Sequence, residues 1–498
     1  MKHPEADDYL VGVVGCGAMG QGIAQVSATG GMRTLIHDAR EGAAAAAKEA
    51  IAGRIRRLAE KGRMSEEDAE AAVDRLVPCD LSGFSDCDAV VEAVFEEISV
   101  KHDVFKAIEA VVSADCLIAT NTSSIPISSL ARACEKRGRV GGLHFFNPVP
   151  LMKLVEVIRA AETTDECVEN LSILGKRMTR VPVVVKDSPG FLVNMGGRAF
   201  TTEGARMNHE GVATPAQIDA IMRDCRHFRM GPFELMDLTG IDVNFPVSNI
   251  VYNGYFQDQR LRTSPNHEAQ FDAGLFGRKT GQGWFGYEGG KPLDRPSADY
   301  ETDAAPIREV RIAEPSEALS AFLAEIGVSV IEGGDGPIVG APIGEDATHM
   351  ALRTGADYRQ LVCLDLTGDT SVRVTAMMAP GSNPNALAGV ASAIAATGRK
   401  VTAINDSPGF VAQRMCAMIS NLGCYMAEIG LASPADIDLA MTLGLNYPLG
   451  PIDLGEDLGV ANTLTIMEAM QAITGEDRYR PTMWLKRRAR LGLKLDTV

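Results

Sequence analysis

One histidine lies in a stretch of the chain whose residue types and spacing suit acid–base chemistry. His144 ends an apolar run, and Glu156 lies twelve residues further on, inside a second apolar run at 154–158. Pro148 and Pro150 favour a turn between the runs, so the second run can return beside the first. A carboxylate beside an imidazole fixes its tautomer and stabilises the imidazolium, which leaves the other ring nitrogen as a base. The alternative is a core histidine bonded to a backbone carbonyl.

A glycine-rich sequence follows the first apolar run of the chain, at residues 9–14. It has the pattern G-x-G-x-x-G and comprises Gly15, Gly17, Ala18, Met19 and Gly20. A helical stretch and a second apolar run follow, and that run leads to Asp38. In such a unit the glycines allow a tight turn and the close approach of a pyrophosphate to a helix N-terminus. The pattern predicts a dinucleotide-binding domain, and Asp38 favours NAD over NADP, although Arg40 leaves that choice open.

Two further apolar runs are expected to end at the same edge of a parallel sheet. The run 116–120 leads into Asn-Thr-Ser-Ser, which contains Ser123, and the run 139–143 leads to His144. Ligands bind at the carboxyl ends of strands in sheets of this class, so the glycine loop, Ser123 and His144 should converge. The alternative for Ser123 is a helix cap. The convergence favours a catalytic over a structural His144.

The composition narrows the classes of function. Domains usually contain about 100–200 residues, so 498 residues, 46% of them hydrophobic, predict several folded domains. The net charge of −17 disfavours nucleic acid and anionic membrane surfaces. The ten cysteines lack metal-ligand spacing, so we expect reduced thiols and no metal site. The acidic N-terminal residues and the absence of a long apolar run predict a cytoplasmic protein that does not enter membranes.

The second half of the chain repeats part of the first. Asp-Ser-Pro-Gly-Phe at 187–191 recurs at 406–410, and Gly-Pro at 231–232 recurs at 450–451, both with an offset of 219. Helical patterns follow both copies, so we expect a duplicated all-α domain. The predicted parts are a Rossmann-type α/β domain over 1–187, a helical domain over 188–288, a linker with a degenerate α/β segment over 289–404, and a second helical copy over 405–498.

The second α/β segment is expected to have lost the chemistry of the first. It contains no G-x-G-x-x-G pattern. Aligning the two halves on a shared proline places Ala376 where the first half has His144. The 219 offset places Gln413 where the first half has Asn194. We therefore expect a structural role for this segment rather than a second active site.

Taken together, these motifs resemble the L-3-hydroxyacyl-CoA dehydrogenase family. The likeness is to its long bacterial form with a duplicated C-terminal domain, of the 3-hydroxybutyryl- or 3-hydroxyadipyl-CoA type. It rests on VGVVGCGAMGQGIA, VVEAVFEEISVK, ATNTSSIPI, GLHFFNPVPLMKLVEVI, KDSPGFLVN and RKTGQGWFGY, and on NDSPGF and LGLNYPLGP in the second half. The resemblance implies NAD-dependent oxidation of a 3-hydroxyacyl-CoA. An NAD-dependent dehydrogenase of a non-CoA hydroxy acid, such as a sugar acid, is the alternative, and a non-catalytic NAD-binding scaffold is disfavoured.

The resemblance also implies roles for individual residues. His144 would take the proton of the 3-hydroxyl group, paired with Glu156, while hydride passes to the nicotinamide. Ser123 and Asn194 would hold the substrate oxygens, and Asn147 would help to position His144 and the nicotinamide end. The implied cofactor contacts are Gly15, Gly17, Ala18, Met19, Gly20, Asp38, Glu96, Lys101, Ser123, Asn147 and Lys279, and the implied CoA contact is Lys61.

Two departures from the family pattern concern the substrate. Arg54 stands, seven residues before Lys61, where the family has a serine, and the basic cluster around it is for the most part interpreted as a solvated helix face. Residues 225–230 lack the G-x-x-Y-P pattern that the second copy keeps, on a wall that the resemblance places toward the substrate. The acyl chain length is therefore open. Because the helical domain forms the dimer contact in shorter relatives, the duplication predicts either an intrachain pseudo-dimer or a homodimer.

Overall fold

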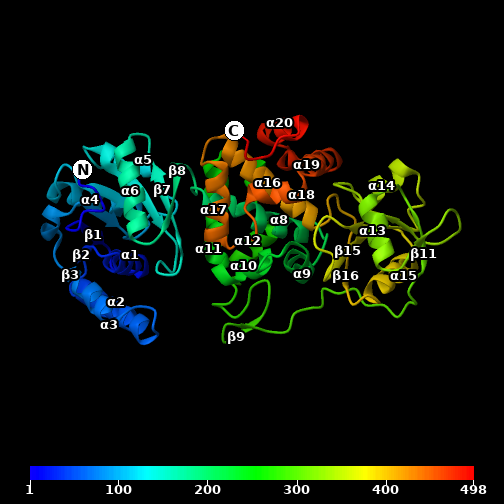
Figure 1. Ribbon diagram of the computed structural model, residues 1–498, viewed down its shortest axis with the longest axis horizontal. Coiled ribbons are helices and arrows are strands. Elements are labelled where there is room, and N and C mark those ends of the chain that lie inside the picture. The colour runs from blue at the N-terminus through cyan, green and yellow to red at the C-terminus, as the bar shows by residue number, and fades with distance from the viewer. Residues whose placement is uncertain (498) are drawn as a thin grey trace. The chain divides into compact units, whose positions relative to one another are not determined.

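The computed structural model describes residues 1–497, which divide into two compact units. Figure 1 labels the helices and strands, with the chain coloured from blue at its N-terminus to red toward its C-terminus. The first unit comprises Met1–Met195 and two segments from much later in the chain, Gly430–Asp436 and Leu443–Leu445. The second unit comprises the other described residues. Both units therefore contain residues from both halves of the sequence.

The first sheet is the predicted Rossmann-type sheet, with two additional strands at one edge. Its strand order is β3-β2-β1-β4-β5-β6-β7-β8, and the first six strands are parallel. The seventh strand, β7, runs antiparallel to β6 and parallel to β8. The strands are β1 (Leu10–Val14), β2 (Arg33–His37), β3 (Leu76–Pro78), β4 (Ala89–Glu92), β5 (Leu117–Thr120), β6 (Val140–Phe145), β7 (Leu154–Arg159) and β8 (Val181–Lys186).

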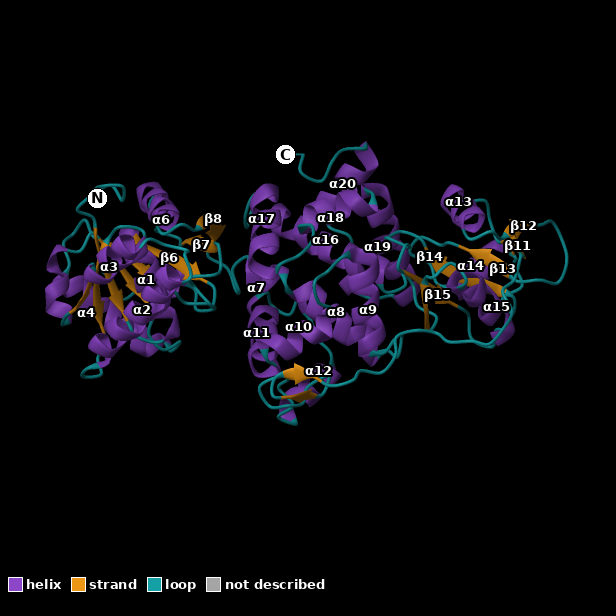
Figure 2. Ribbon diagram, turned by 60° about the horizontal axis from the view of Figure 1, so that its bottom comes forward, coloured by secondary structure: helices purple, strands orange, loops and turns teal. Residues whose placement is uncertain are grey.

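Helices cover this sheet, and Figure 2 shows them in purple beside the orange strands. The central strands are continuous apolar runs because strands covered by helices are buried on both faces. Side-chain caps begin α3 at Ser65 and α6 at Thr164. The helices are α1 (Ala18–Thr29), α2 (Ala43–Glu60), α3 (Glu66–Asp74), α4 (Ile98–Val111), α5 (Ile127–Ala131) and α6 (Asp165–Arg177), with short 3-10 helices η1 (Leu81–Asp86) and η2 (Arg137–Arg139).

The two predicted helical copies are both present. Asp219 accepts hydrogen bonds from the backbone N–H groups of Phe233 and Glu234, and Asp438 does the same for residues 452 and 453, at the 219 offset. The first copy contains α7 (Val193–Gly196), α8 (Arg198–His209), α9 (Pro215–Arg226), α10 (Pro232–Thr239), α11 (Ile241–Gly254), η3 (Gln259–Leu261) and α12 (Pro265–Asp272). The second contains α16 (Ala412–Glu428), α17 (Pro434–Leu445), α18 (Pro451–Leu458), α19 (Val460–Thr474), η4 (Asp477–Tyr479) and α20 (Met483–Leu491).

One helix differs between the copies and from the sequence-based expectation. The helical pattern of residues 191–210 predicts a single helix, but the first copy has two, α7 and α8, separated at Gly197. The second copy has the continuous helix α16, with Met415 and Cys416 where the first has two adjacent glycines. Two successive glycines weaken a helix because their backbone is free to leave the helical conformation. The expectation of one long helix was therefore wrong for the first copy.

The second sheet is smaller and lacks a dinucleotide loop. Its order is β12-β11-β13-β14-β15-β16, and the connection after β11 is Ala-Glu-Pro-Ser, residues 313–316, in place of glycines. The strands are β11 (Glu309–Ile312), β12 (Ser329–Val330), β13 (Ile338–Gly340), β14 (Leu361–Asp365), β15 (Arg373–Met377) and β16 (Lys400–Ile404); the helices are α13 (Glu317–Glu325), α14 (Ala347–Thr354) and α15 (Pro384–Ala395). A hairpin of β9 (Tyr287–Glu288) and β10 (Lys291–Pro292) precedes it.

Strands β14, β15 and β16 correspond to β6, β7 and β8. In both sheets an antiparallel pair is followed by a parallel pair, and the last strand runs into Asp-Ser-Pro-Gly-Phe. In the first sheet Glu156 lies beside Val183. The 219 offset carries Val183 onto Thr402, which lies beside Thr375. Thr375 therefore occupies the position of Glu156.

This register corrects the alignment made on the shared proline. Thr375 pairs with Asp365 across β14 and β15, as Glu156 pairs with His144 across β6 and β7. Asp365, and not Ala376, therefore stands at the position of the histidine. The proline alignment was wrong by one strand because Pro380 follows β15, whereas the proline of the first half follows β6.

Each helical copy contacts the α/β segment of the other half. In the first unit the backbone N–H of Lys186 donates to the carbonyl of Leu431 at 3.1 Å. In the second unit the N–H of Asn405 donates to the carbonyl of Val212 at 2.9 Å. Donors and acceptors are both 219 residues apart, so the two contacts are equivalent. The halves of the chain exchange this contact as two subunits of a symmetric dimer would.

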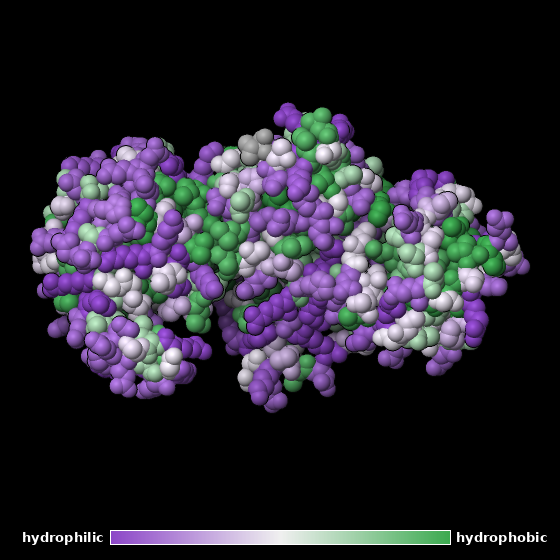
Figure 3. Space-filling view, viewed as in Figure 1, coloured by the Kyte–Doolittle hydropathy of each residue, from purple (hydrophilic) through white to green (hydrophobic). Residues whose placement is uncertain are grey.

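Hydrophilic residues cover most of the face of the protein shown in Figure 3, and most of the cysteines are buried. No helix among residues 1–497 combines the length and the apolar character needed to cross a bilayer. All ten cysteines are free thiols, and all but Cys79 are buried. The expectation of unpaired, mostly buried thiols is confirmed.

Candidate active site

The antiparallel pairing of β6 and β7 brings His144 and Glu156 together. The two residues are direct cross-strand partners, and Nδ1 of the imidazole lies 2.6 Å from Oε2 of the carboxylate. Both side chains are buried, with 5% and 0% of their surface exposed. The expected return of the second run beside the first is confirmed. A buried carboxylate on Nδ1 orients the ring and leaves Nε2 for proton transfer.

The second oxygen of Glu156 is held by backbone. Oε1 accepts hydrogen bonds from the N–H groups of Leu192, at 3.0 Å, and Val193, at 2.8 Å. Phe191 presents these two amides by adopting φ of 49°, a left-handed conformation that bulky residues rarely take. Asp187, at the start of the same turn, anchors it by accepting from the N–H groups of residues 127 and 128. Both carboxylate oxygens of Glu156 are thus occupied.

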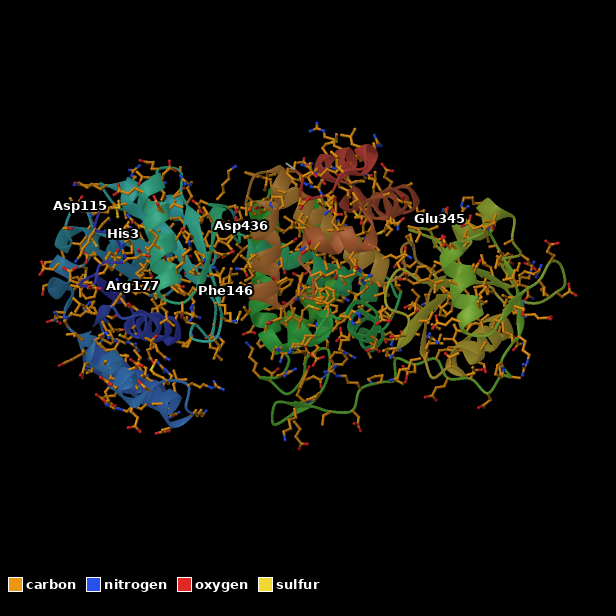
Figure 4. The ribbon with its side chains drawn as sticks, in the orientation of Figure 1. His3, Asp115, Phe146, Arg177, Glu345 and Asp436 are labelled. Carbon is orange, nitrogen blue, oxygen red and sulfur yellow. The ribbon has the colours of Figure 1, made fainter. Side chains whose placement is uncertain are left out.

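Aromatic rings stand beside the imidazole. The ring of Phe146, labelled in Figure 4, lies 4.5 Å from that of His144 between centroids. The ring of Phe191 lies 5.8 Å away. An apolar surrounding of this kind strengthens the interaction between imidazole and carboxylate because the local dielectric is low.

Glu96 organises the loop that contains Ser123. Its Oε1 accepts from the hydroxyl of Thr122 at 2.6 Å and from the backbone N–H of Ser123 at 2.8 Å. The hydroxyl of Ser123 is 3.3 Å from the same oxygen. Burial would raise the pKa of Glu96, but the Thr122 hydrogen bond and the Lys101 ammonium outweigh it and the pKa is lowered. The carboxylate therefore stays charged and holds the loop after β5.

Sequence reasoning missed Glu92, which explains the burial of Lys101. Glu92 is fully buried at the end of β4, and its Oε1 lies 2.7 Å from Nζ of Lys101. Its Oε2 accepts from the hydroxyl of Thr120 at 2.6 Å. Lys101 is itself only 1% exposed and lies 3.3 Å from Glu96. A charged residue that ends an apolar strand was the available signal, since buried charges are normally paired.

The predicted amides lie around the same edge. Nδ2 of Asn194, at the start of α7, donates to the backbone carbonyl of Ser123 at 3.3 Å. Asn147 is exposed, just beyond the end of β6. Asn121, which sequence reasoning did not single out, accepts from the backbone N–H of Phe145 at 2.8 Å and joins the ends of β5 and β6. The structure thus brings together Ser123, Asn194 and the ends of both strands.

The glycine loop has the geometry that a dinucleotide requires. A Cβ atom on Gly15 would lie 2.5 Å from the carbonyl oxygen of Ala93, and one on Gly20 would lie 1.8 Å from that of Gly15. Gly17, in contrast, has open space within 4 Å of the same position. Helix α1 begins at Ala18 without a side-chain cap, so its first N–H groups are available to a phosphate. The residues present therefore fit a pyrophosphate.

Asp38 provides an acceptor at the end of β2. Its carboxylate accepts from the backbone N–H of Cys16 at 2.8 Å and from Nε of Arg40 at 3.0 Å. The hydrogen bond from Arg40 is the main cause of a pKa lowered to about 2, so Asp38 is charged at neutral pH. A charged acceptor here suits ribose hydroxyls and repels a 2′-phosphate.

Comparison with known proteins identifies the family. The family model described as "3-hydroxyacyl-CoA dehydrogenase, NAD binding domain" matches residues 10–188. The model for the C-terminal domain of the same enzymes matches twice, over 190–287 and 409–495. The chain belongs to the 3-hydroxyacyl-CoA dehydrogenase family. The two C-terminal matches begin 219 residues apart, which confirms the duplication of the helical domain.

Members of two lengths resemble this 3-hydroxyacyl-CoA dehydrogenase. The 3-hydroxyadipyl-CoA dehydrogenase of Escherichia coli is 35% identical, over 97% of each chain. A probable 3-hydroxybutyryl-CoA dehydrogenase of Deinococcus radiodurans is 38% identical over 55% of this chain and 99% of its own. The crystal structure of a 3-hydroxybutyryl-CoA dehydrogenase from Escherichia coli superposes with a TM-score of 0.86 at 34% identity, over 97% of this chain and 98% of that one. The relatives that match along 97% of this chain thus share its second half as well as its first.

Membership makes this chain an NAD-dependent enzyme. Its second half carries different residues at the positions equivalent to His144 and Glu156. There Asp365 accepts from Nε2 of Gln413, the counterpart of Asn194, at 3.1 Å. It also accepts from the N–H and the hydroxyl of Thr367. With aspartate in place of histidine and Thr375 in place of Glu156, this position lacks an oriented imidazole. The residues at this position thus differ from those that the proline alignment placed there, and the structural role expected of this segment stays a prediction.

The basic end of α2 is only partly available to the CoA of a 3-hydroxyacyl-CoA substrate. Nε of Arg54 donates to the side chain of Gln25 at 3.0 Å, and Nε of Arg56 pairs with Glu70 at 2.7 Å. Lys61, immediately after the helix, is exposed. Arg54 and Arg56 therefore match the interpretation as a helix face with its own partners, and Lys61 remains the candidate.

Two positions to which the resemblance assigns a role, Lys279 and the segment 225–230, lie in the second unit of the dehydrogenase. Lys279 pairs there with Asp242. The end of α9 contacts the second α/β segment: the Cys225 thiol lies 3.4 Å from the carbonyl of Arg373, and Arg226 donates to the carbonyl of Thr367 at 3.0 Å. Cys225 and Arg226 thus have partners within the second unit. The substrate wall expected over 225–230 stays a prediction.

Proposed function

We propose that this chain catalyses the reversible, NAD-dependent oxidation of an L-3-hydroxyacyl-CoA to the 3-oxoacyl-CoA. The observation that carries the proposal is the His144–Glu156 pair, on the same sheet as a loop that fits a dinucleotide. Family membership supports the substrate class. The names of the relatives point to a short or dicarboxylic acyl chain, 3-hydroxybutyryl or 3-hydroxyadipyl.

His144 is the base in the proposed reaction. Because Nδ1 is bonded to Glu156, Nε2 is the nitrogen that takes the proton of the 3-hydroxyl group. Glu156 stabilises the imidazolium that results. Bound NAD supplies the acceptor for the hydride that leaves C3, so the alcohol loses one proton and one hydride and becomes a ketone. In the reverse direction the imidazolium returns the proton to the oxygen.

Ser123 and Asn194 hold the substrate oxygens in this proposal. The side chain of Asn194 donates a hydrogen bond to the carbonyl of Ser123, which fixes the two residues relative to one another. Glu96 accepts from the N–H of Ser123 and pairs with Lys101, so these two residues hold the loop. Phe146 and Phe191 exclude water from the imidazole. The proposed contacts of the adenosine and pyrophosphate are Gly15, Gly17, Ala18, Met19, Gly20 and Asp38; Asn147 and Lys279 are assigned to the nicotinamide side and the cofactor, and Lys61 to CoA.

The test is the oxidation of NADH by acetoacetyl-CoA and by 3-oxoadipyl-CoA, compared between wild type and His144→Gln. A positioned general base contributes about 10²- to 10⁴-fold, so kcat of the variant should fall by about that factor. KM for NADH should change little, because His144 lies outside the glycine loop. A wild-type enzyme that reduces no 3-oxoacyl-CoA, and that free CoA does not inhibit, would contradict the proposal and favour a non-CoA hydroxy acid.

We also propose that the chain is a pseudo-dimer and acts in the cytoplasm. The exchanged contacts of Lys186 with Leu431 and of Asn405 with Val212 support the first point. Free and mostly buried cysteines suit a reducing compartment and support the second. A sedimentation mass equal to one chain is expected if the duplicated domain replaces dimerisation, and twice that mass would show that a homodimer forms as well.

A further inference from the structure

A glycine of the second helical copy lies against the residues that hold Glu156. Gly444, near the end of α17, belongs to the first compact unit although it lies far along the chain. A Cβ atom built on it would lie 3.1 Å from Cδ2 of Leu154 and 3.1 Å from Cγ2 of Val193. Contacts of that length are tighter than ordinary van der Waals distances, so a side chain at this position would push its neighbours by a few tenths of an ångström.

Both neighbours of Gly444 belong to the support of Glu156. Leu154 lies two residues before it on β7, and side chains two apart point to the same face of a strand. The backbone N–H of Val193 donates to Oε1 of Glu156 at 2.8 Å. Whatever moves Val193 therefore moves one of the donors that fix the carboxylate, and with it the hydrogen bond to His144.

The same short helix touches α17 at a second place. Gly196 ends α7, and a Cβ atom on it would lie 2.5 Å from the sulfur of Met441, one turn before Gly444. Helix α7 also contains Asn194. Gly196 of α7 and Gly444 of α17 thus allow the two helices to approach closely. Val193, whose N–H donates to Glu156, belongs to α7.

The second half of the chain offers the comparison. By the 219 offset the counterpart of Gly444 is Cys225, whose thiol contacts the carbonyl of Arg373, the counterpart of Leu154. The side chain of Cys225 is thus accommodated against the α/β segment that has Thr375 in place of Glu156. Glycine occurs where the other helical copy packs against the α/β segment that carries Glu156.

We propose that Gly444 is a positioning residue of the catalytic pair, through which the second helical copy completes the active site of the first half. By lacking a side chain it lets α17 pack directly on Val193 and Leu154, which keeps the two amide donors on Glu156. The inference rests on the proposed function. It gives the second half of the chain a part in catalysis although that half carries no chemistry of its own.

The test is Gly444→Ala, which adds the single methyl group that meets Leu154 and Val193. Misplacement of a catalytic group by 1 Å costs about 100-fold, so a shift of a few tenths of an ångström should lower kcat about tenfold. KM for NADH should stay unchanged, because the glycine loop is not involved. Alanine favours helix more than glycine does, so the variant should fold.

Gly175→Ala is the matched control. Gly175 is also a helix glycine, in α6, and a Cβ atom on it would lie 3.0 Å from Val155 on the same strand as Leu154. The side chain of Val155 points to the face opposite Glu156. The control should therefore leave kcat unchanged. An equal fall of kcat in both variants would show a general loss of packing and overturn the proposal.

Val193→Ala tests whether the added methyl group at position 444 acts on Glu156 through Val193. It removes the two methyl groups of Val193 that the new Cβ would meet, leaves the contact with Leu154, and keeps the N–H that donates to Glu156. The double variant Gly444→Ala/Val193→Ala should recover kcat to within about twofold of Val193→Ala, as coupled residues do in a double-mutant cycle. Failure of this rescue would overturn the proposal, as would an unchanged kcat in Gly444→Ala.

A readout independent of turnover separates this inference from the proposed function. The Nδ1 proton of His144, shared with Glu156, should give a strongly downfield proton NMR signal that His144→Gln abolishes. We expect the signal to weaken or shift in Gly444→Ala, to stay in Gly175→Ala and to return in the double variant. If wild type turns over no 3-oxoacyl-CoA, the proposed function fails while the signal still decides the role of Gly444. A signal unaffected by Gly444→Ala would contradict that role.

Discussion

At the scale of single residues, the site depends on carboxylates whose two oxygens have different tasks. Glu156 holds the imidazole with one oxygen and is itself held by backbone through the other. Glu96 likewise gathers the Ser123 loop on one oxygen and faces Lys101 with the other. Asp38 accepts from the glycine loop and from Arg40. Each carboxylate therefore couples a reactive or binding group to a fixed part of the fold.

Asp38→Ser should change the choice of cofactor. The substitution removes the charged acceptor for the ribose and frees Arg40, which now pairs with Asp38. Losing a hydrogen bond to a charged group costs about 1.5–3 kcal/mol, so KM for NAD should rise about tenfold or more. NADP should become a better substrate relative to NAD. Steady-state kinetics with both cofactors measure this, and Arg40→Ala in the same background should cancel the gain for NADP. An unchanged NAD preference would contradict the role of Asp38.

At the scale of elements, the sequence predicted those features that depend on the spacing of residues along the chain. The glycine loop, the return of β7 beside β6 and the approach of Glu156 to His144 followed from spacing and from two prolines. The 219 offset predicted the duplicated helices. The register of β14 to β16 could not be predicted from spacing. The proline after β15 was aligned with the proline after β6, although the two prolines follow strands that are not equivalent. Asp365 therefore became visible at the histidine position only through strand pairing.

The buried pair of Glu92 and Lys101 was likewise hidden, since its partners come from β4, α4 and β5. Lys101→Met should leave Glu92 buried without its counter-charge and destabilise the protein by about 3–5 kcal/mol. Lys106→Met, on the exposed side of the same helix, should stay within about 0.5 kcal/mol. Urea denaturation of both variants measures the difference. Equal stability of the two would show that Lys101 is not needed to balance Glu92.

At the scale of the whole molecule, one charge network joins the helical copies. Glu203 of α8 is fully buried, and its two oxygens each lie 2.6 Å from an arginine of the second copy, Arg414 and Arg478. At the 219 offset Leu422 replaces Glu203, Met195 takes the place of Arg414 and Gln259 that of Arg478. The two copies are thus equivalent in backbone, but the residues at the counterpart positions of this network carry no charge.

This network should make stability depend on acid. Burial would raise the pKa of Glu203, but Arg478 and Arg414 lower it to about 2, below the value of about 4.3 in an unfolded chain. The pairing therefore stabilises the folded state fully above about pH 4.3 and is lost as the pH falls toward 2.

Glu203→Gln should lower Tm at neutral pH, because two buried arginines lose their counter-charge. The gap in Tm between wild type and variant should narrow as the pH falls from about 4.3 toward 2. Glu210→Gln, which affects a partly exposed partner of Arg414, should have a smaller effect. Thermal unfolding across this pH range measures the gap. A gap that stays constant down to pH 2 would contradict the assignment.

The exchanged contacts have a consequence for the continuity of the chain. Residues 293–306 contain neither helix nor strand, and most of them are at least partly exposed, so a protease could cut there. The N-terminal fragment would keep His144 and Glu156, and the C-terminal fragment would keep Gly444 and Leu431. Since each fragment carries the surface on which the other packs, a nicked enzyme should stay associated and active. The two fragments produced separately should regain activity only when mixed.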